Sequence, residues 1–109
     1  MQETEDNEFQ RKLTIMSPKC EEQLDEALTY IEENSPRQAE IMRLRFFKIL
    51  KTLERMPGIG TIYQDGMRKM LLGKYPYYIY YREKEDIIEI VGIWHTSRGV
   101  EFEEPGDEI

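Results

Sequence analysis

Two Ser-Pro pairs, Ser17 with Pro18 and Ser35 with Pro36, place the strongest limits on how this chain can fold. A serine hydroxyl can accept hydrogen bonds from the free N–H groups at a helix start, and proline suits the first helical position. Gln38 stands where the partner of a capping box would stand. Apolar residues then recur at helical spacing, as Cys20, Leu24, Ala27, Leu28 and Ile31 and again as Ala39, Met42, Phe46, Ile49, Leu50 and Leu53. These patterns predict helices over 18–33 and from 36 onward, joined as an antiparallel hairpin.

The segments on either side of the hairpin have the composition of strands. The stretch "KLTIM" (12–16) precedes the first helix, and "PGIG" (57–60) ends the second, since Pro and Gly do not continue a helix cheaply. Residues 67–73, 75–83 and 86–98 follow, the last two rich in aromatic and β-branched residues. The order β-α-α-β-β-β predicts an α+β fold. A small antiparallel sheet, ending in a three-stranded meander, would be covered on one face by the helical hairpin.

The charge of the chain is unevenly distributed. The formal net charge is −7, yet the first eight residues hold four acids and the last nine hold five, with no base in either. Between them, acids dominate residues 19–34 and bases dominate 43–98. Short acidic ends cannot bury enough apolar surface to order alone. We therefore predict an acidic N-terminal tail over 1–10, one folded domain over 11–100, and an acidic C-terminal tail over 101–109.

Several classes of protein are disfavoured by what the sequence contains. A single cysteine, Cys20, and a single histidine, His95, exclude an internal disulfide and make a Cys/His zinc site implausible. The "GIG" at 58–60 lacks the third glycine and the following helix of a nucleotide-binding fingerprint. We therefore expect no metal and no cofactor. No segment is apolar enough to span a membrane and the N-terminus does not resemble a signal peptide, so we expect a cytoplasmic protein with no membrane partner.

Several motifs follow one another in an order that resembles a known superfamily. After the helical hairpin come "LERMPGIG", then Arg68, then "YPYYIYYRE", then "IIEIVGIWHTSR", which holds the only His and the only Trp. This order resembles the RelE/ParE superfamily of toxins from type II toxin–antitoxin modules, over roughly residues 11–99, and "IWHTSR" is closer to the ParE-like members. The resemblance implies the α+β fold predicted above. It also implies an antitoxin that folds over the toxin and can form a hetero-oligomer with it.

The resemblance leaves two mechanisms open. ParE-like members bind and poison DNA gyrase, whereas RelE-like members cleave mRNA in the ribosome. If the chain is a nuclease, the resemblance implies Arg68, His95 and Arg98 as catalytic residues, with His95 as the acid or base. Residues predicted to bind the target or a phosphate are Arg55, Arg68, Lys69, Tyr80, Arg82, Trp94 and Arg98. Residues predicted to bind the antitoxin are Leu44, Phe47 and Lys51.

The end of the chain favours the gyrase reading. After Arg98 the sequence "GVEFEEPGDEI" has five acids and no Tyr, Lys, Arg or His, and an acidic tail beside an RNA site would repel the substrate. His95 would then be a structural residue at the sheet edge. A third reading is an inactive toxin or one with a different target. Which side chains share a face depends on strand register, because a slip of one residue reverses every assignment.

Overall fold

The computed structural model describes residues 11–97, so both acidic tails and Arg98 lie outside the described residues. The elements are β1 (Leu13–Met16), α2 (Pro18–Asn34), α3 (Pro36–Arg55), a 3₁₀ turn (Pro57–Ile59), β2 (Thr61–Ile62), β3 (Met67–Leu71), β4 (Tyr77–Glu83) and β5 (Ile87–His95). The predicted order of strands and helices is confirmed. One element was missed, the short β2, since two residues are too few to show an alternating pattern.

Both helices begin where the serines predicted. The Ser17 hydroxyl accepts from the Cys20 N–H at 3.0 Å, and the Ser35 hydroxyl accepts from the Gln38 N–H at 3.2 Å. The capping box is only half formed, because the Gln38 side chain instead accepts a hydrogen bond from the Tyr75 hydroxyl at 2.9 Å. Within residues 11–97, neither helix is both long and apolar enough to cross a membrane.

The sheet has the strand order β1-β5-β4-β3-β2. Strands β2 to β5 pair antiparallel, as the predicted meander requires, but β1 runs parallel to β5. The sheet is therefore mixed, and the expectation of a wholly antiparallel sheet was wrong. Apolar patterning shows which residues are buried but carries no information about strand direction, which here depends on how the chain returns after the hairpin.

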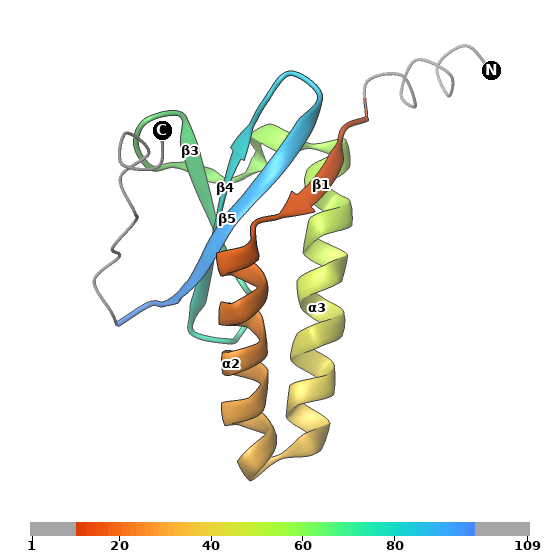
Figure 1. The fold of residues 1–109 in the computed structure, drawn as a ribbon, viewed down its shortest axis with the longest axis vertical. Coiled ribbons are helices and arrows are strands. Elements are labelled where there is room, and N and C mark those ends of the chain that lie inside the picture. Colours follow the sequence, from red (N-terminus) through yellow and green to blue (C-terminus); the bar gives the residue numbers. More distant parts are fainter. Residues whose placement is uncertain (1–10, 98–109) are drawn as a thin grey trace, which may run out of the picture.

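The two helices pack on one face of the sheet (Figure 1). The hydrophobic core lies between the helices and this face of the sheet. From the sheet, Ile79 and Tyr81 of β4 and Ile88, Ile90 and Ile93 of β5 face the helices. From the helices come Cys20, Leu24, Ala27, Met42, Phe46, Leu50 and Leu53. Cys20 is fully buried, and burial with the nearby charge of Glu21 raises the pKa of its thiol to about 12. Its burial agrees with its place in the apolar spacing of the first predicted helix.

A β-bulge in β5 changes which side chains face the core. The register passes from Tyr80 opposite Gly92 to Tyr81 opposite Ile90, so Val91 has no partner on β4. Because of this extra residue, Ile90 and Ile93 both face the helices although they are three positions apart. Gly92 and Trp94 consequently lie on the other face, which we call the distal face.

Candidate functional site

Arg68 lies on the helix-facing side of the sheet, near the end of α3. It is opposite Tyr81, a core residue, and residues directly opposite on paired strands share a face. The Arg68 guanidinium donates to the Gly60 carbonyl oxygen at 2.8 Å. The Tyr81 hydroxyl donates to the Pro57 carbonyl at 2.7 Å and accepts from the Gly60 N–H at 2.9 Å. Arg68 is thus part of a network that fixes the "PGIG" turn against the sheet.

This network also explains the environment of Tyr81. The ring is fully buried, and burial raises the pKa of its hydroxyl, with Glu83 adding to the rise. The hydrogen bond from Gly60 and the charge of Arg68 act in the opposite direction. The stretch "YPYYIYYRE" contains this tyrosine, but the sequence does not show that its hydroxyl is hydrogen-bonded to a turn more than twenty residues earlier.

Arg82 lies on the distal face, away from Arg68. It is opposite Glu89, whose carboxylate is 3.6 Å from the Arg82 Nε and 3.2 Å from the Lys84 Nζ. The Arg82 Nε atom is buried, and no acceptor in the described part of the chain is within hydrogen-bond distance of it. Arg82 is therefore held beside a carboxylate, on the same face as Lys69 and Tyr80 but on the opposite face from Arg68.

His95, the last residue of β5, is at the opposite end of the sheet from Arg68. It is opposite Tyr77, whose ring meets the imidazole edge to face with centroids 5.2 Å apart. The Nδ1 atom of His95 accepts from the Ser97 N–H at 3.1 Å and lies 2.8 Å from the Ser97 hydroxyl. The structure does not bring His95 and Arg68 together, and Arg98 lies outside the described residues.

Three of the predicted target-binding residues do come together on the distal face. The rings of Tyr80 and Trp94 meet edge to face at 5.4 Å, and Lys69 is opposite Tyr80 on the neighbouring strand. Two tyrosines complete the group, since the Lys69 ammonium lies 4.4 Å from the Tyr78 ring centroid and 5.5 Å from that of Tyr63. We call Tyr63, Lys69, Tyr78, Tyr80 and Trp94 the distal cluster.

The centre of the distal cluster is buried and its other members are partly exposed. Only 2% of Tyr80 and 7% of Trp94 are exposed. Burial raises the pKa of the Tyr80 hydroxyl, and Tyr63 and Tyr78 raise it further. Tyr63 and Tyr78 were not predicted as site residues. The alternation of Tyr78 with Tyr80 in β4 could have indicated the first, whereas Tyr63 precedes the turn before β3 and had no such signal.

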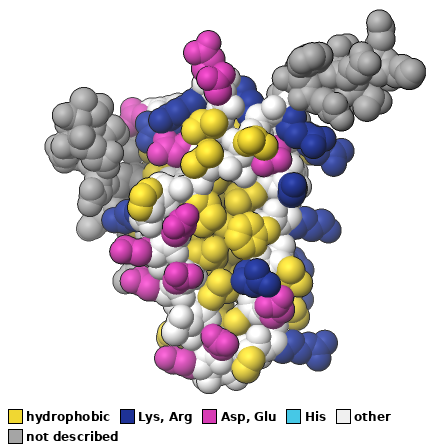
Figure 2. All heavy atoms as spheres, turned by 45° about the vertical axis from the view of Figure 1, so that its right-hand side comes forward, with side chains coloured by type: hydrophobic (Ala, Val, Ile, Leu, Met, Phe, Trp, Pro, Cys, Tyr) yellow, Lys and Arg dark blue, Asp and Glu magenta, His cyan; other side chains and the backbone are white. Residues whose placement is uncertain are grey.

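The residues predicted to bind the antitoxin lie together on α3. Leu44 is 57% exposed and Phe47 is 42% exposed, Lys51 is exposed one turn further on, and Phe47 rests edge to face on the buried Phe46. We call Leu44, Phe47 and Lys51 the hairpin surface. Figure 2 shows the side of the molecule on which α3 lies: hydrophobic side chains gather in its middle, with Lys and Arg along one margin and Asp and Glu mostly toward the other. Arg55, the last residue of α3, is exposed.

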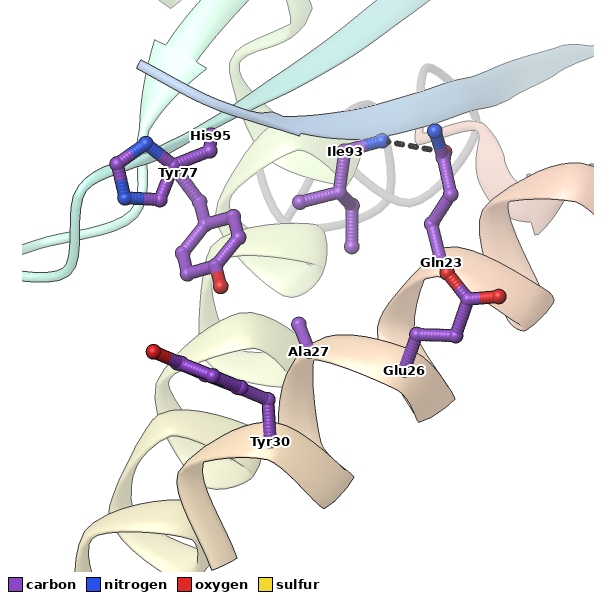
Figure 3. Close-up of a pocket in the computed structure, with 7 residues that line it drawn as sticks. All are labelled: Gln23, Glu26, Ala27, Tyr30, Tyr77, Ile93 and His95. Carbon is purple, nitrogen blue, oxygen red and sulfur yellow. Dashed lines mark hydrogen bonds between the residues drawn. The ribbon is translucent and has the colours of Figure 1, made fainter. Parts of the chain in front are cut away.

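A small pocket of about 210 Å³ lies between α2 and the ends of β4 and β5. Figure 3 shows the rings of Tyr30, Tyr77 and His95 around it, with Ala27 and Ile93 between them. Gln23 and Glu26 line it as well, and the Gln23 side-chain oxygen accepts from the Ile93 N–H at 2.8 Å. Among residues 11–97, no three His, Cys, Asp or Glu side chains gather in a way that could hold a metal ion.

Comparison with known proteins agrees with this architecture. A family model described as "ParE toxin of type II toxin-antitoxin system, parDE" matches residues 14–100. A solved structure titled "Chromosomal ParDE TA system from P. aeruginosa" superposes with a TM-score of 0.68 at 21% sequence identity, over 81% of this chain and 98% of the other. No curated protein matches significantly. The helical hairpin on a small sheet and the family match over most of its length agree, so the chain belongs to the ParE toxin family of type II toxin–antitoxin systems.

Proposed function

We propose that this chain inhibits bacterial growth by binding DNA gyrase in the cytoplasm and that a cognate antitoxin neutralises it. The observation that carries the proposal is the separation of the groups that a nuclease would need. Arg68 and His95 are opposite Tyr81 and Tyr77 on β4, four residues apart, which is about 13 Å along a strand. General acid–base catalysis needs groups within about 3 Å of the atoms they serve, so this spacing supports inhibition by binding alone.

The ion pairs and hydrogen bonds of these groups point the same way. Arg68 donates to the Gly60 carbonyl, and Arg82 lies on the other face beside Glu89. Each guanidinium is therefore already oriented by a partner within the fold, and the two do not converge on one phosphate. The ribosome-dependent nuclease therefore remains the alternative function without a specific observation in its favour.

We place the gyrase contact at the distal cluster. Tyrosine and tryptophan rings are typical of the residues that dominate the energy of protein interfaces. Lys69, Tyr63 and Tyr78 are partly exposed around the buried Tyr80 and Trp94, which fix the geometry of the group. The cluster therefore offers a rigid centre with a partly exposed rim.

We place the antitoxin on the hairpin surface. The exposed Leu44 and Phe47 with Lys51 beside them fit an amphipathic segment that carries acidic residues. The apolar side of such a segment would cover the hydrophobic side chains of this surface. Its acidic residues would lie near the Lys and Arg side chains along the margin seen in Figure 2. The two proposed surfaces lie on different elements, so antitoxin binding and gyrase binding can be disturbed separately.

The decisive experiment is a pulse-label measurement in a bacterial host. The chain is induced alone, and thymidine and methionine incorporation are followed over the first minutes. An early fall in thymidine incorporation while methionine incorporation continues is the expected result. An early fall in methionine incorporation would replace gyrase with the ribosome. Unchanged growth would indicate an inactive or differently targeted member.

The matched control is His95→Ala. Under the proposed function it should inhibit thymidine incorporation as strongly as the unchanged chain, because His95 takes no part in chemistry. Under the nuclease alternative it should lose activity by about a hundredfold or more, the usual contribution of a general acid or base.

A further inference from the structure

The pocket beside α2 has walls of a distinctive composition. Tyr30 comes from α2, Tyr77 from the start of β4, and His95 from the end of β5, so three elements each contribute one ring (Figure 3). The 5.2 Å edge-to-face contact fixes Tyr77 and His95 relative to each other. Ala27 and the buried Ile93 lie between the rings and keep the pocket apolar there.

The charge of the pocket has one sign. Glu26 is an acid on its rim, and none of the lining residues is Lys or Arg. The Nδ1 atom of His95 accepts the Ser97 N–H, so this ring nitrogen is already engaged within the chain. An anion would therefore meet Glu26 without a lysine or arginine of the lining to compensate it, whereas a cation would meet a carboxylate and the faces of aromatic rings.

We propose that this pocket binds the cationic end of a lysine or arginine side chain from a protein partner. The carboxylate of Glu26 would pair with the charge, and Tyr30 and Tyr77 would contact the methylene stem and the cationic group. A guanidinium is favoured over an ammonium, because its flat face stacks on aromatic rings. The inference goes beyond the proposed function, since it concerns neither the distal cluster nor the hairpin surface.

The size of the pocket and its surroundings favour a side chain over a free small molecule. Its volume of about 210 Å³ is below the range of about 300–1,000 Å³ typical of pockets for small ligands. Tyr30 is 66% exposed and stands among the acids of α2, and exposed tyrosines of this kind are enriched where proteins meet. A partner that covered Tyr30 would deliver a side chain directly into the pocket.

The test is an NMR titration of the full chain with Nα-acetyl-arginine amide. His95 is the only histidine, so the imidazole gives one unambiguous Cε1–H signal. The expected result is a saturable shift of this signal together with the rings of Tyr30 and Tyr77. Glu26→Gln should weaken binding about fivefold, the upper range for an exposed ion pair. Glu22→Gln, an exposed acid of α2 outside the pocket, is the matched control and should leave binding unchanged.

Three results would overturn the proposal. The first is an equal shift with Nα-acetyl-glutamine amide, which has no charge. The second is equal binding by Glu26→Gln and Glu22→Gln. The third is tighter binding of choline than of the arginine amide, which would make the pocket a site for a free organic cation. Tyr30→Ala provides an independent check, because so exposed a ring can be removed without disturbing the fold, and it should also weaken binding.

Discussion

The guanidinium of Arg68 and the carbonyl of Gly60 are joined by a 2.8 Å hydrogen bond that ties β3 to the turn after α3. A charged donor to a partly buried carbonyl contributes more to stability than an ordinary hydrogen bond. Arg68 is therefore expected to stabilise the fold, whether or not it also binds the target.

Arg68→Ala is expected to lower the free energy of unfolding by about 1–3 kcal/mol, because it leaves the Gly60 carbonyl without its donor. Urea unfolding followed by circular dichroism measures the change. Arg55→Ala removes an exposed arginine at the end of α3 and should change the value by less than about 0.5 kcal/mol. Equal effects of the two substitutions would contradict the structural role of Arg68.

Gly58 and Gly60 offer a matched pair two residues apart. A Cβ on Gly60 would lie 2.6 Å from the Tyr81 hydroxyl oxygen and 2.9 Å from the Lys69 carbonyl oxygen, whereas a Cβ on Gly58 has its closest contact at 4.0 Å from Arg68. Gly60→Ala should therefore destabilise the chain by about 1–3 kcal/mol. Gly58→Ala should be close to neutral when the melting temperatures of the two variants are compared. A harmless Gly60→Ala would mean that the turn can move away from Tyr81.

Cys20 makes stability depend on alkaline pH. Burial raises the pKa of its thiol from 9.0 to about 12. Above about pH 9 the unfolded chain therefore holds fewer protons than the folded one, and the free energy of unfolding falls as pH rises toward 12. Urea midpoints between pH 8 and 11 should fall less steeply in Cys20→Ala. Tyr80 and Tyr81 contribute to the remaining slope, because their raised pKa values act in the same direction.

Lys69 tests the proposed gyrase contact. Lys69→Gln removes the charge above the Tyr63 and Tyr78 rings and keeps most of the stem. The toxin concentration that half-inhibits supercoiling by purified gyrase should rise about tenfold, the effect of losing one energetically important contact. Lys48→Gln, an exposed lysine of α3, should inhibit as the unchanged chain does. No difference between the two would remove the distal cluster from the proposed interface.

Leu44 tests the hairpin surface. Leu44→Asp places a negative charge where we expect an acidic, apolar antitoxin segment, so the antitoxin dissociation constant should rise at least about tenfold. Supercoiling inhibition by the free toxin should not change. Leu71→Asp alters an exposed leucine of β3 and serves as the control in the same calorimetric titration. If Leu71→Asp weakened the antitoxin more, the binding surface would have to be moved to the sheet.

Local chemistry explains why the helices were predictable and the site was not. Ser17 and Ser35 act within three residues of themselves, so the sequence alone reveals both helix starts. The faces of β5 depend on the bulge at Val91, which arises from its pairing with β4 and has no local signature. Arg68 and Arg82 were placed together because both are basic residues of the meander. Their faces depend on the pairing of β3 with β4, which sets Arg68 opposite Tyr81 and Arg82 opposite Met67, and spacing along the chain does not reveal this register.

One contact near the start of the chain bears on how the sheet avoids unwanted pairing. The buried Glu54 carboxylate, near the end of α3, accepts hydrogen bonds from both the Thr14 N–H and the Thr14 hydroxyl at 3.1 Å. Strand β1 is an edge of the sheet, and an edge with unsatisfied N–H groups is a template for another chain. A neighbouring strand would have to displace a carboxylate to pair at Thr14. The opposite edge strand, β2, is only two residues long, so it offers another chain few backbone groups with which to pair.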